Sequence, residues 1–147
     1  MASDRSDSEI LVIDASLTLR LVLDNSAQAT VQAYFEGWIE HGCSFTAPTL
    51  WVYETTSAIH KSVHFEQLTK KEGEEALQQV LTLNVDVIAP SATLAKAAFD
   101  WTTKLKRASA YDSFYLALAD EHDAPLWTAD GKLVRAVNLD WVRLGTE

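Results

Sequence analysis

The sequence predicts a single three-layer α/β domain with a central, mostly parallel sheet of about five strands flanked by helices. Two observations lead to this fold class. Short apolar runs rich in β-branched residues alternate with longer runs of helical periodicity, and no repeat or linker divides the chain. With 147 residues, the chain is long enough to bury a sizeable core. We expect a disordered, polar and acidic tail over residues 1–8 and the folded domain over residues 9–147.

The first half of the chain contains two predicted strands and the helices that follow them. The run EILVI, residues 9–13, is short and apolar, as in a buried strand, and SLTLRLVLDNS continues as a short helix and loop. SAQATVQAYFEGWIEHG gathers apolar residues on one face and stops at Gly42, which predicts an amphipathic helix. CSFTAP is the second strand, and we expect Pro48 to open the helix TLWVYETTSAIHKSV.

The second half of the chain continues this alternation. Thr69 followed by Glu72 is the pattern of a capping box, which starts the helix TKKEGEEALQQVLTL. VDVIAP is the third strand, and Ser91 caps the helix SATLAKAAFDWTTKLKR. The helix AYDSFYLALADEH, the strand APLWT, the short helix GKLVRAV and the strand LDWVRL complete the predicted domain.

Composition narrows the class of protein without deciding its function. The 21 acidic and 12 basic residues give a formal net charge of −9, which argues against a broad basic face for nucleic acid but suits a protein that concentrates carboxylates around divalent ions. No apolar run is long enough to span a bilayer, so we expect no membrane contact. Cys43 is the only cysteine, which excludes an internal disulfide and fits a cytoplasmic location.

Four acidic residues are predicted to share one edge of the sheet. Asp14 ends the first strand, and Asp130 follows the strand APLWT. Glu54 lies early in the helix after the second strand, and Asp112 lies in the first turn of the helix that leads to APLWT. Because parallel α/β sheets bind ligands at the carboxyl ends of their strands, these acids are expected to converge there.

The chemistry of such a cluster points to a divalent ion. Crowded carboxylates repel one another unless a cation neutralises them, and oxygen ligands without His or Cys suit Mg²⁺ or Mn²⁺. Such ions support phosphodiester hydrolysis. Ser16 and Thr128, each two residues from one of these acids, would add hydroxyls. Spacing alone leaves a second interpretation open, in which Asp112 only stabilises a helix N-terminus and Asp14 is a turn residue.

Three segments resemble a known family in their order and spacing. LVIDAS, APTLWVYETTSAI and AYDSFYLALADEHDAPLWTADGKL look like the PIN domain, and in particular like the small VapC-like toxins of type II toxin–antitoxin systems. The resemblance extends over about residues 10–144. It implies a PIN-like fold and a metal-dependent endoribonuclease that hydrolyses phosphodiester bonds in single-stranded RNA. It also implies an antitoxin protein as partner and a homodimer.

The resemblance also assigns roles to individual residues. Asp14, Asp112 and Asp130 would hold Mg²⁺ or Mn²⁺, and metal-activated water would cleave RNA to leave a 5′-phosphate and a 3′-hydroxyl. Glu54 would complete the acidic site and orient a water. The hydroxyl positions of the family fall on Ser16 and Thr128. The expected catalytic residues are therefore Asp14, Glu54, Asp112 and Asp130.

A short basic cluster lies just before the third of these acids. Lys104, Lys106 and Arg107 would bring phosphates to the site despite the negative net charge. An equally good interpretation is that they are cations stabilised by the C-terminus of their helix.

Two further functional hypotheses remain open at this stage. The chain would be a non-catalytic α/β interaction module if the acids serve only as caps and surface charge, or a PIN nuclease acting on structured RNA or DNA. Trp51 either packs in its helix or flanks the site. Asp120 and Asp123, late in the helix that begins near Asp112, are interpreted as solvated residues.

Overall fold

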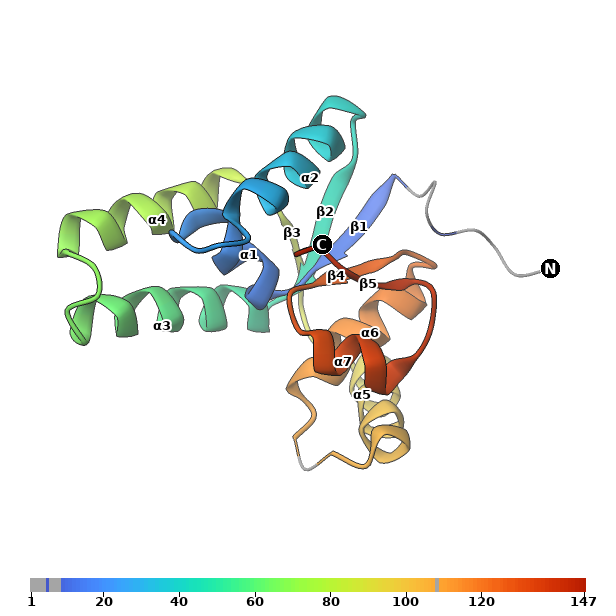
Figure 1. The fold of residues 1–147 in the computed structure, drawn as a ribbon. Helices are drawn as coiled ribbons and strands as arrows, with labels where there is room; N and C mark the ends of the chain where they lie inside the picture. Colours follow the sequence, from blue (N-terminus) through green and yellow to red (C-terminus); the bar gives the residue numbers. More distant parts are fainter. Residues whose placement is uncertain (1–4, 6–8, 108) are drawn as a thin grey trace.

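Five parallel strands form the central sheet of the computed structural model, which describes residue 5 and residues 9–107 and 109–147 (Figure 1). The strand order is β3-β2-β1-β4-β5, which confirms the predicted fold class. The short strands begin one to three residues later than the sequence predicts. They are β1 (Ile10–Ile13), β2 (Ser44–Pro48), β3 (Asp86–Ile88), β4 (Leu126–Thr128) and β5 (Val142–Leu144).

Helices cover both faces of the sheet. The chain first steps outward from β1 to β2 and β3, and then returns past β1 to β4 and β5. Because crossovers between parallel strands are right-handed, this reversal puts the earlier helices on one face and the later helices on the other, as Figure 1 shows. The helices are α1 (Ala15–Val22), α2 (Gln28–Glu40), α3 (Leu50–His64), α4 (Lys70–Thr82), α5 (Ala92–Leu105), α6 (Tyr111–Glu121) and α7 (Gly131–Val137). Within the described residues, no helix combines the length and apolar character needed to cross a membrane.

Helix ends follow the local chemistry of the sequence, with one correction. The capping box at the start of α4 is formed in both directions between Thr69 and Glu72, and the Ser91 hydroxyl accepts from the first turn of α5. Pro48, however, does not open α3. It is the last residue of β2, and the helix starts at Leu50. A proline suits this position because β2 ends there and needs no further ladder donor.

The core lies between the sheet and the helical layers. β1 is buried at three of its four positions, and α6 buries six of its eleven residues between the sheet and α5. Trp51 belongs to this core: its side chain is 2% exposed, and its indole N–H donates to the Thr18 hydroxyl at 2.9 Å. Of the two predictions for this residue, packing within the core is therefore correct.

Arg5 lies at the end of the domain opposite the predicted site, where it contacts the end of α6 and Trp141. The predicted tail, residues 1–8, falls outside the described residues except for Arg5. The Arg5 guanidinium pairs with Asp120 at 3.0 Å and Asp123 at 3.1 Å, and lies 4.2 Å from the centre of the Trp141 ring. Both acids are exposed, as interpreted from the sequence, and in addition they pair with Arg5.

Candidate active site

The predicted site lies where the strand order of the sheet reverses. The chain leaves β1 toward one face and leaves β4 toward the other, so the helices that follow these neighbouring strands diverge. In open α/β sheets, this divergence creates the crevice in which ligands bind. Asp14 follows β1 and Asp130 follows β4, which puts both carboxylates at this crevice.

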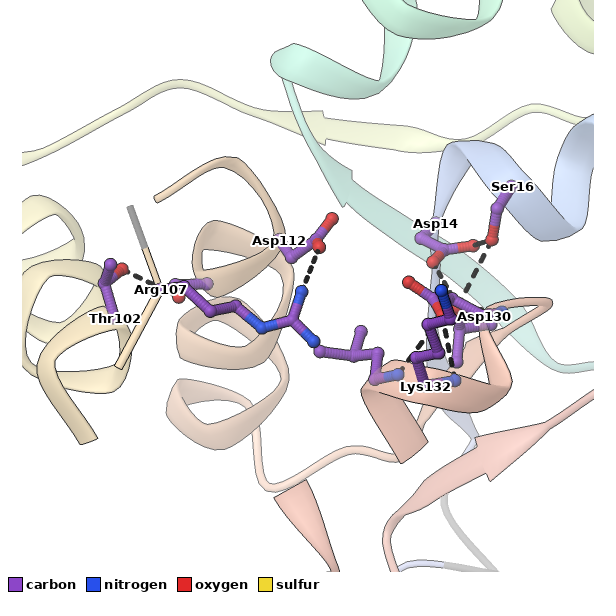
Figure 2. Close-up of polar contacts among 10 residues, drawn as sticks. Asp14, Ser16, Thr102, Arg107, Asp112, Asp130 and Lys132 are labelled. Carbon is purple, nitrogen blue, oxygen red and sulfur yellow. Dashed lines mark hydrogen bonds and ion pairs between the residues drawn. The ribbon is translucent and has the colours of Figure 1, made fainter. Parts of the chain in front are cut away.

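Asp14 is held at the bottom of the site by a ring of donors. It caps α1, accepting from the Leu17 N–H at 2.9 Å through Oδ1. The Ser16 hydroxyl donates to the same oxygen at 2.7 Å, and the Thr128 hydroxyl donates to Oδ2. The side chain is only 7% exposed. Figure 2 shows Asp14 and Ser16 beside Asp130 on one side of the site. This carboxylate is therefore fixed before any ligand arrives.

The two hydroxyls connect β1 to the turn after β4. Ser16 Oγ accepts from the Ala129 N–H, and Thr128 Oγ1 accepts from the Asp130 N–H, both at 3.0 Å. Each hydroxyl has one hydrogen, which it gives to Asp14 when that residue is ionised, so the 3.2 Å contact between the two hydroxyl oxygens then contains no shared hydrogen. The hydroxyls predicted from the sequence thus position Asp14 and the following acid together.

Burial works against the charge of Asp14. Removal from water raises the pKa of the Asp14 carboxyl from its usual 3.8 to about 6, although the hydrogen bonds from Thr128, Leu17 and Ser16 oppose this change. The charge of Asp112 raises the pKa further. A buried carboxylate with strong donors on one side and another acid nearby favours a cation on its open side.

Asp130 occupies the N-cap of α7. Its Oδ1 accepts from the Lys132 N–H at 3.0 Å and from the Leu133 N–H at 3.2 Å. These bonds give partners to backbone N–H groups of the first turn that have none within the helix, and they fix the direction of the Asp130 side chain. The cap interpretation and the site interpretation are therefore compatible, because capping occupies one oxygen of the carboxylate.

Glu54 enters the site from the other side, on α3. Its Oε1 accepts from the Tyr115 hydroxyl at 2.7 Å, and burial raises the pKa of Glu54 against the lowering effect of that hydrogen bond. Tyr115 is 2% exposed, and burial together with the charges of Glu54 and Asp14 raises its pKa far above the usual value, so it remains a donor. Tyr115 is a site residue that the sequence did not predict. The available signal was its position three residues after Asp112, on the same face of α6.

Asp112 stands in the first turn of α6 and pairs with Arg107. The guanidinium reaches Oδ2 at 3.2 Å, while the Arg107 backbone N–H donates to the Thr102 carbonyl (Figure 2). Burial raises the pKa of Asp112, the Arg107 charge lowers it, and the charge of Asp130 raises it.

Electrostatic coupling shows that the four predicted acids form one group. The charge of Asp112 raises the pKa of both Asp14 and Glu54, and the charge of Asp130 raises that of Asp112. Asp112 is therefore the member that interacts with the other three. The predicted convergence of acids from β1, α3, α6 and the turn after β4 is present in the fold.

The donor set fits a hard divalent cation held partly through water. All four acids offer oxygen, and Mg²⁺ commonly keeps several waters while taking one or two carboxylates from the protein. Across residues 5, 9–107 and 109–147, no three His, Cys, Asp or Glu side chains are placed as they stand to hold an ion between them. Two carboxylates are instead engaged by hydroxyls, one by a helix N-terminus and one by Arg107. An ion in this crevice would bind through the open oxygens and displace the guanidinium.

The three predicted basic residues lie in different environments. Arg107 reaches the site, whereas the Lys104 ammonium lies 5.1 Å from the centre of the Trp101 ring on its own helix. Lys106 is the left-handed C-cap residue of α5, with φ 54°. Arg107 is thus the member of the cluster that contacts a site carboxylate.

Comparisons with known proteins agree with this arrangement. A family model described as the PIN domain matches residues 11–139, which is most of the chain and includes all four acids. Among curated protein sequences, no relative of the chain was found.

Solved structures share the fold at low sequence identity. VapC20 from Mycobacterium tuberculosis, a sarcin–ricin-loop-cleaving toxin, is 17% identical with a TM-score of 0.67, over 90% of this chain and 98% of that one. A toxin–antitoxin complex from Klebsiella pneumoniae is 15% identical with a TM-score of 0.62, over 92% and 97%. VapBC2 from Rickettsia felis, bound to a promoter DNA fragment, is 16% identical with a TM-score of 0.67, over 92% and 96%.

Proposed function

Because this chain belongs to the PIN domain family, we propose that it is a metal-dependent endoribonuclease that hydrolyses phosphodiester bonds in single-stranded RNA. We further propose that it is the toxin of a toxin–antitoxin pair. The observation that carries the proposal is the four-acid group at the topological switch point, with Asp112 coupled to the other three acids.

Mg²⁺ or Mn²⁺ would be held by Asp14, Asp112 and Asp130. When bound, such an ion supplies a nucleophilic water at neutral pH and neutralises charge that develops on the phosphate. The chain provides the fixed framework for that chemistry. The Ser16 and Thr128 hydroxyls hold Asp14 in one rotamer, so its carboxylate reaches the reacting position without reorganisation.

Glu54 has a different role in this proposal. Tyr115 holds Oε1, and no other described residue donates to this carboxylate, so Oε2 is open to a water in the crevice. The raised pKa of Glu54 makes its carboxylate a better proton acceptor than an exposed glutamate. Glu54 therefore orients a water and accepts its proton.

Arg107 is the proposed phosphate contact. Its guanidinium already lies in the crevice and pairs with Asp112, and this partly exposed pair is weak enough to exchange for a phosphate when a cation takes over the carboxylate. The net charge of −9 is then compatible with RNA binding because the attraction is local.

The proposed partners are an antitoxin protein and a second copy of the chain. One structural relative is solved as a toxin–antitoxin complex. The hairpin of α3 and α4, which extends away from the sheet in Figure 1, exposes Phe65 by 68% and Leu81 by 57%. Exposed apolar side chains of this size suit contact with another protein. Sedimentation of the purified chain, alone and with the product of a neighbouring gene, tests both partners.

Cleavage of total RNA by the purified chain is the decisive test of the activity. We expect discrete fragments with Mn²⁺, none with EDTA, and none from Asp14→Asn with Mn²⁺. Asp140→Asn is the matched control, because this exposed residue precedes β5 at the opposite end of the sheet. Mapping of the fragment ends should show a 5′-phosphate.

Metal binding gives a second readout that does not depend on finding the right RNA. Mn²⁺ should raise the melting temperature of the wild-type chain and of Asp140→Asn, but not that of Asp14→Asn, because a ligand specific to the folded state stabilises it. Metal binding without cleavage of RNA would favour a nuclease acting on DNA or on a narrower target. If the chain neither binds metal nor cleaves RNA, the non-catalytic interaction module would be favoured.

A further inference from the structure

An apolar pocket adjoins the acidic crevice and has no part in the chemistry proposed above. It has a volume of about 170 Å³ and lies between the turn after β2, the end of β3 and the beginnings of α5 and α6. Its floor and walls are apolar, and none of its lining residues carries a charge. They include Pro48, Leu50, Ile88, Leu94 and Phe114.

Two tyrosines form the border between this pocket and the acids. Tyr53 and Tyr111 line the apolar pocket, and both also line a neighbouring hollow that contains Glu54. Tyr111 borders a third hollow together with Glu54 and Asp112. The apolar pocket is therefore continuous with the site through these two rings.

The exposure of the two rings is unusual for their size. Tyr53 is 67% exposed and Tyr111 is 64% exposed, although each lies beside an apolar pocket in which a ring could bury surface. Tyrosine rings at the edge of a binding site offer a flat apolar face at low entropic cost. Their placement beside the crevice leaves those faces available to a ligand that enters the site.

We propose that this pocket takes the base of the nucleotide next to the scissile phosphate, stacked on the ring of Tyr111 with Tyr53 on its other side. The inference rests on the proposed ribonuclease function and adds a contact with a base to the phosphate contact proposed for Arg107. An unpaired base is flat, uncharged and next to an anion, and so matches an uncharged pocket joined to a cation site. Stacking on aromatic side chains is the usual way in which proteins hold unpaired bases.

The dimensions of the pocket favour a base over a protein segment. Pockets for drug-sized ligands range from about 300 to 1,000 Å³, so a volume of about 170 Å³ suits one ring system. The apolar pocket also adjoins the acids, since the hollow that both rings line contains Glu54, and the hollow beside Tyr111 contains Glu54 and Asp112. A second copy of this chain that covered the apolar pocket would also have to cover the acidic crevice.

Fluorescence of 2-aminopurine in a short single-stranded oligouridylate tests the proposal. The probes carry 2-aminopurine at successive positions, and binding is measured with Mn²⁺ in a Glu54→Gln background, which keeps the three proposed metal ligands and lacks the proposed proton acceptor. Stacking should quench the fluorescence at one position. Tyr111→Ala should abolish that quenching and weaken binding about 5- to 150-fold, the range for loss of one stacked base. Tyr111→Phe should retain both, because the ring face remains.

Phe99→Ala is the matched control, since Phe99 is a 71% exposed ring on α5 that lies outside the pocket lining. Equal losses from Phe99→Ala and Tyr111→Ala would overturn the proposal, as would unchanged quenching in Tyr111→Ala or no binding of any probe. A change in sedimentation on Tyr111→Ala with quenching intact would assign the pocket to a second copy and also overturn it. Position-specific quenching together with no cleavage of total RNA by the wild-type chain would retain the pocket while the proposed activity fails.

Discussion

The two sides of the acidic crevice are built in different ways. On the side of β1 and β4, Asp14 and Asp130 follow adjacent paired strands, cap helices and accept from backbone N–H groups. On the other side, Glu54 and Asp112 come from helices, and their carboxylates accept hydrogen bonds from the side chains Tyr115 and Arg107. The side of Asp14 and Asp130, here the backbone-held side, is thus fixed by backbone N–H groups together with the Ser16 and Thr128 hydroxyls. The side of Glu54 and Asp112, here the side-chain-held side, depends on the side chains of Tyr115 and Arg107 alone.

This difference separates the parts of the site that position a ligand from the parts that respond to it. Changing the backbone-held side should damage activity and alter the pH dependence of folding together. Changing the side-chain-held side should alter protonation or affinity while leaving the fold close to intact. Four substitutions test this division, and we expect their effects to decrease in the order given.

Asp14→Asn should have the largest effect on activity and a favourable or neutral effect on stability. We expect kcat/KM for RNA cleavage to fall roughly 100-fold or more, since the change removes several kcal/mol of transition-state stabilisation that depends on the metal site. The metal-free variant at pH 8 should be at least as stable as the wild type, because the buried charge is gone. A lower free energy of unfolding at that pH would contradict this account of Asp14.

The sign of the pH dependence follows from the raised pKa of Asp14. With a pKa of about 6 in the folded chain and a usual value of 3.8, the folded state binds the extra proton between these pH values. The free energy of unfolding of the metal-free chain should therefore fall by about 3 kcal/mol as the pH rises through this window, and then level off. Urea denaturation at several pH values measures it, and the same series on Asp14→Asn should lack this component.

Thr128→Val should destabilise the chain more than either of the two following substitutions, Tyr115→Phe and Arg107→Gln. It removes a donor from the buried Asp14 carboxylate and an acceptor from the Asp130 N–H, which together are worth roughly 3 kcal/mol. The pKa of Asp14 should rise further, so the pH dependence of unfolding should extend to higher pH. Thr128→Ser keeps the hydroxyl and should retain the wild-type pH dependence. Equal pH profiles for the two variants would exclude this role of the hydroxyl.

The sequence predicts the backbone-held side of the crevice better than the other side. Asp14 and Asp130 are placed by the rule that parallel strands present ligands at their carboxyl ends, which requires only that the strands be recognised. Their hydroxyl neighbours follow from local spacing. The limits of the strands are predicted less accurately. β3 and β5 have three residues each, and their limits are set by pairing with a neighbouring strand.

Contacts between distant segments account for what the sequence does not predict. Tyr115 in an apolar helix has the pattern of a core residue, and its bond to Glu54 joins positions 61 residues apart. The contact of Arg5 with Asp120 likewise joins positions 115 residues apart. Periodicity identifies which face of a helix is buried, but not which hydroxyl or guanidinium on another element it meets.

Tyr115→Phe should alter Glu54 without disturbing the backbone-held side. The variant keeps the buried ring and removes the hydroxyl that donates to Oε1, so the pKa of Glu54 should rise further. A hydrogen bond to a charged group is worth about 1.5–3 kcal/mol, and partial exposure of Glu54 puts the expected loss of stability at the lower end. The acidic limb of the pH–rate profile should move to higher pH. A profile identical to that of the wild type would remove Glu54 from the proposed proton transfer.

Arg107→Gln should have the smallest effect on stability and opposite effects on two ligands. The ion pair with Asp112 is 29% and 42% exposed at its two side chains, so its loss should change the free energy of unfolding by less than about 1 kcal/mol. Because the guanidinium and a metal ion compete for the same carboxylate, Mn²⁺ should bind several-fold more tightly to the variant in calorimetry. Because the guanidinium is also the proposed phosphate contact, KM for RNA should rise.

Lys104→Gln, which removes a cation lying over Trp101, is the control and should change neither the Mn²⁺ affinity nor KM for RNA. If Arg107→Gln instead weakened Mn²⁺ binding, the arginine would be a structural support of Asp112 and the division between the two sides would not hold.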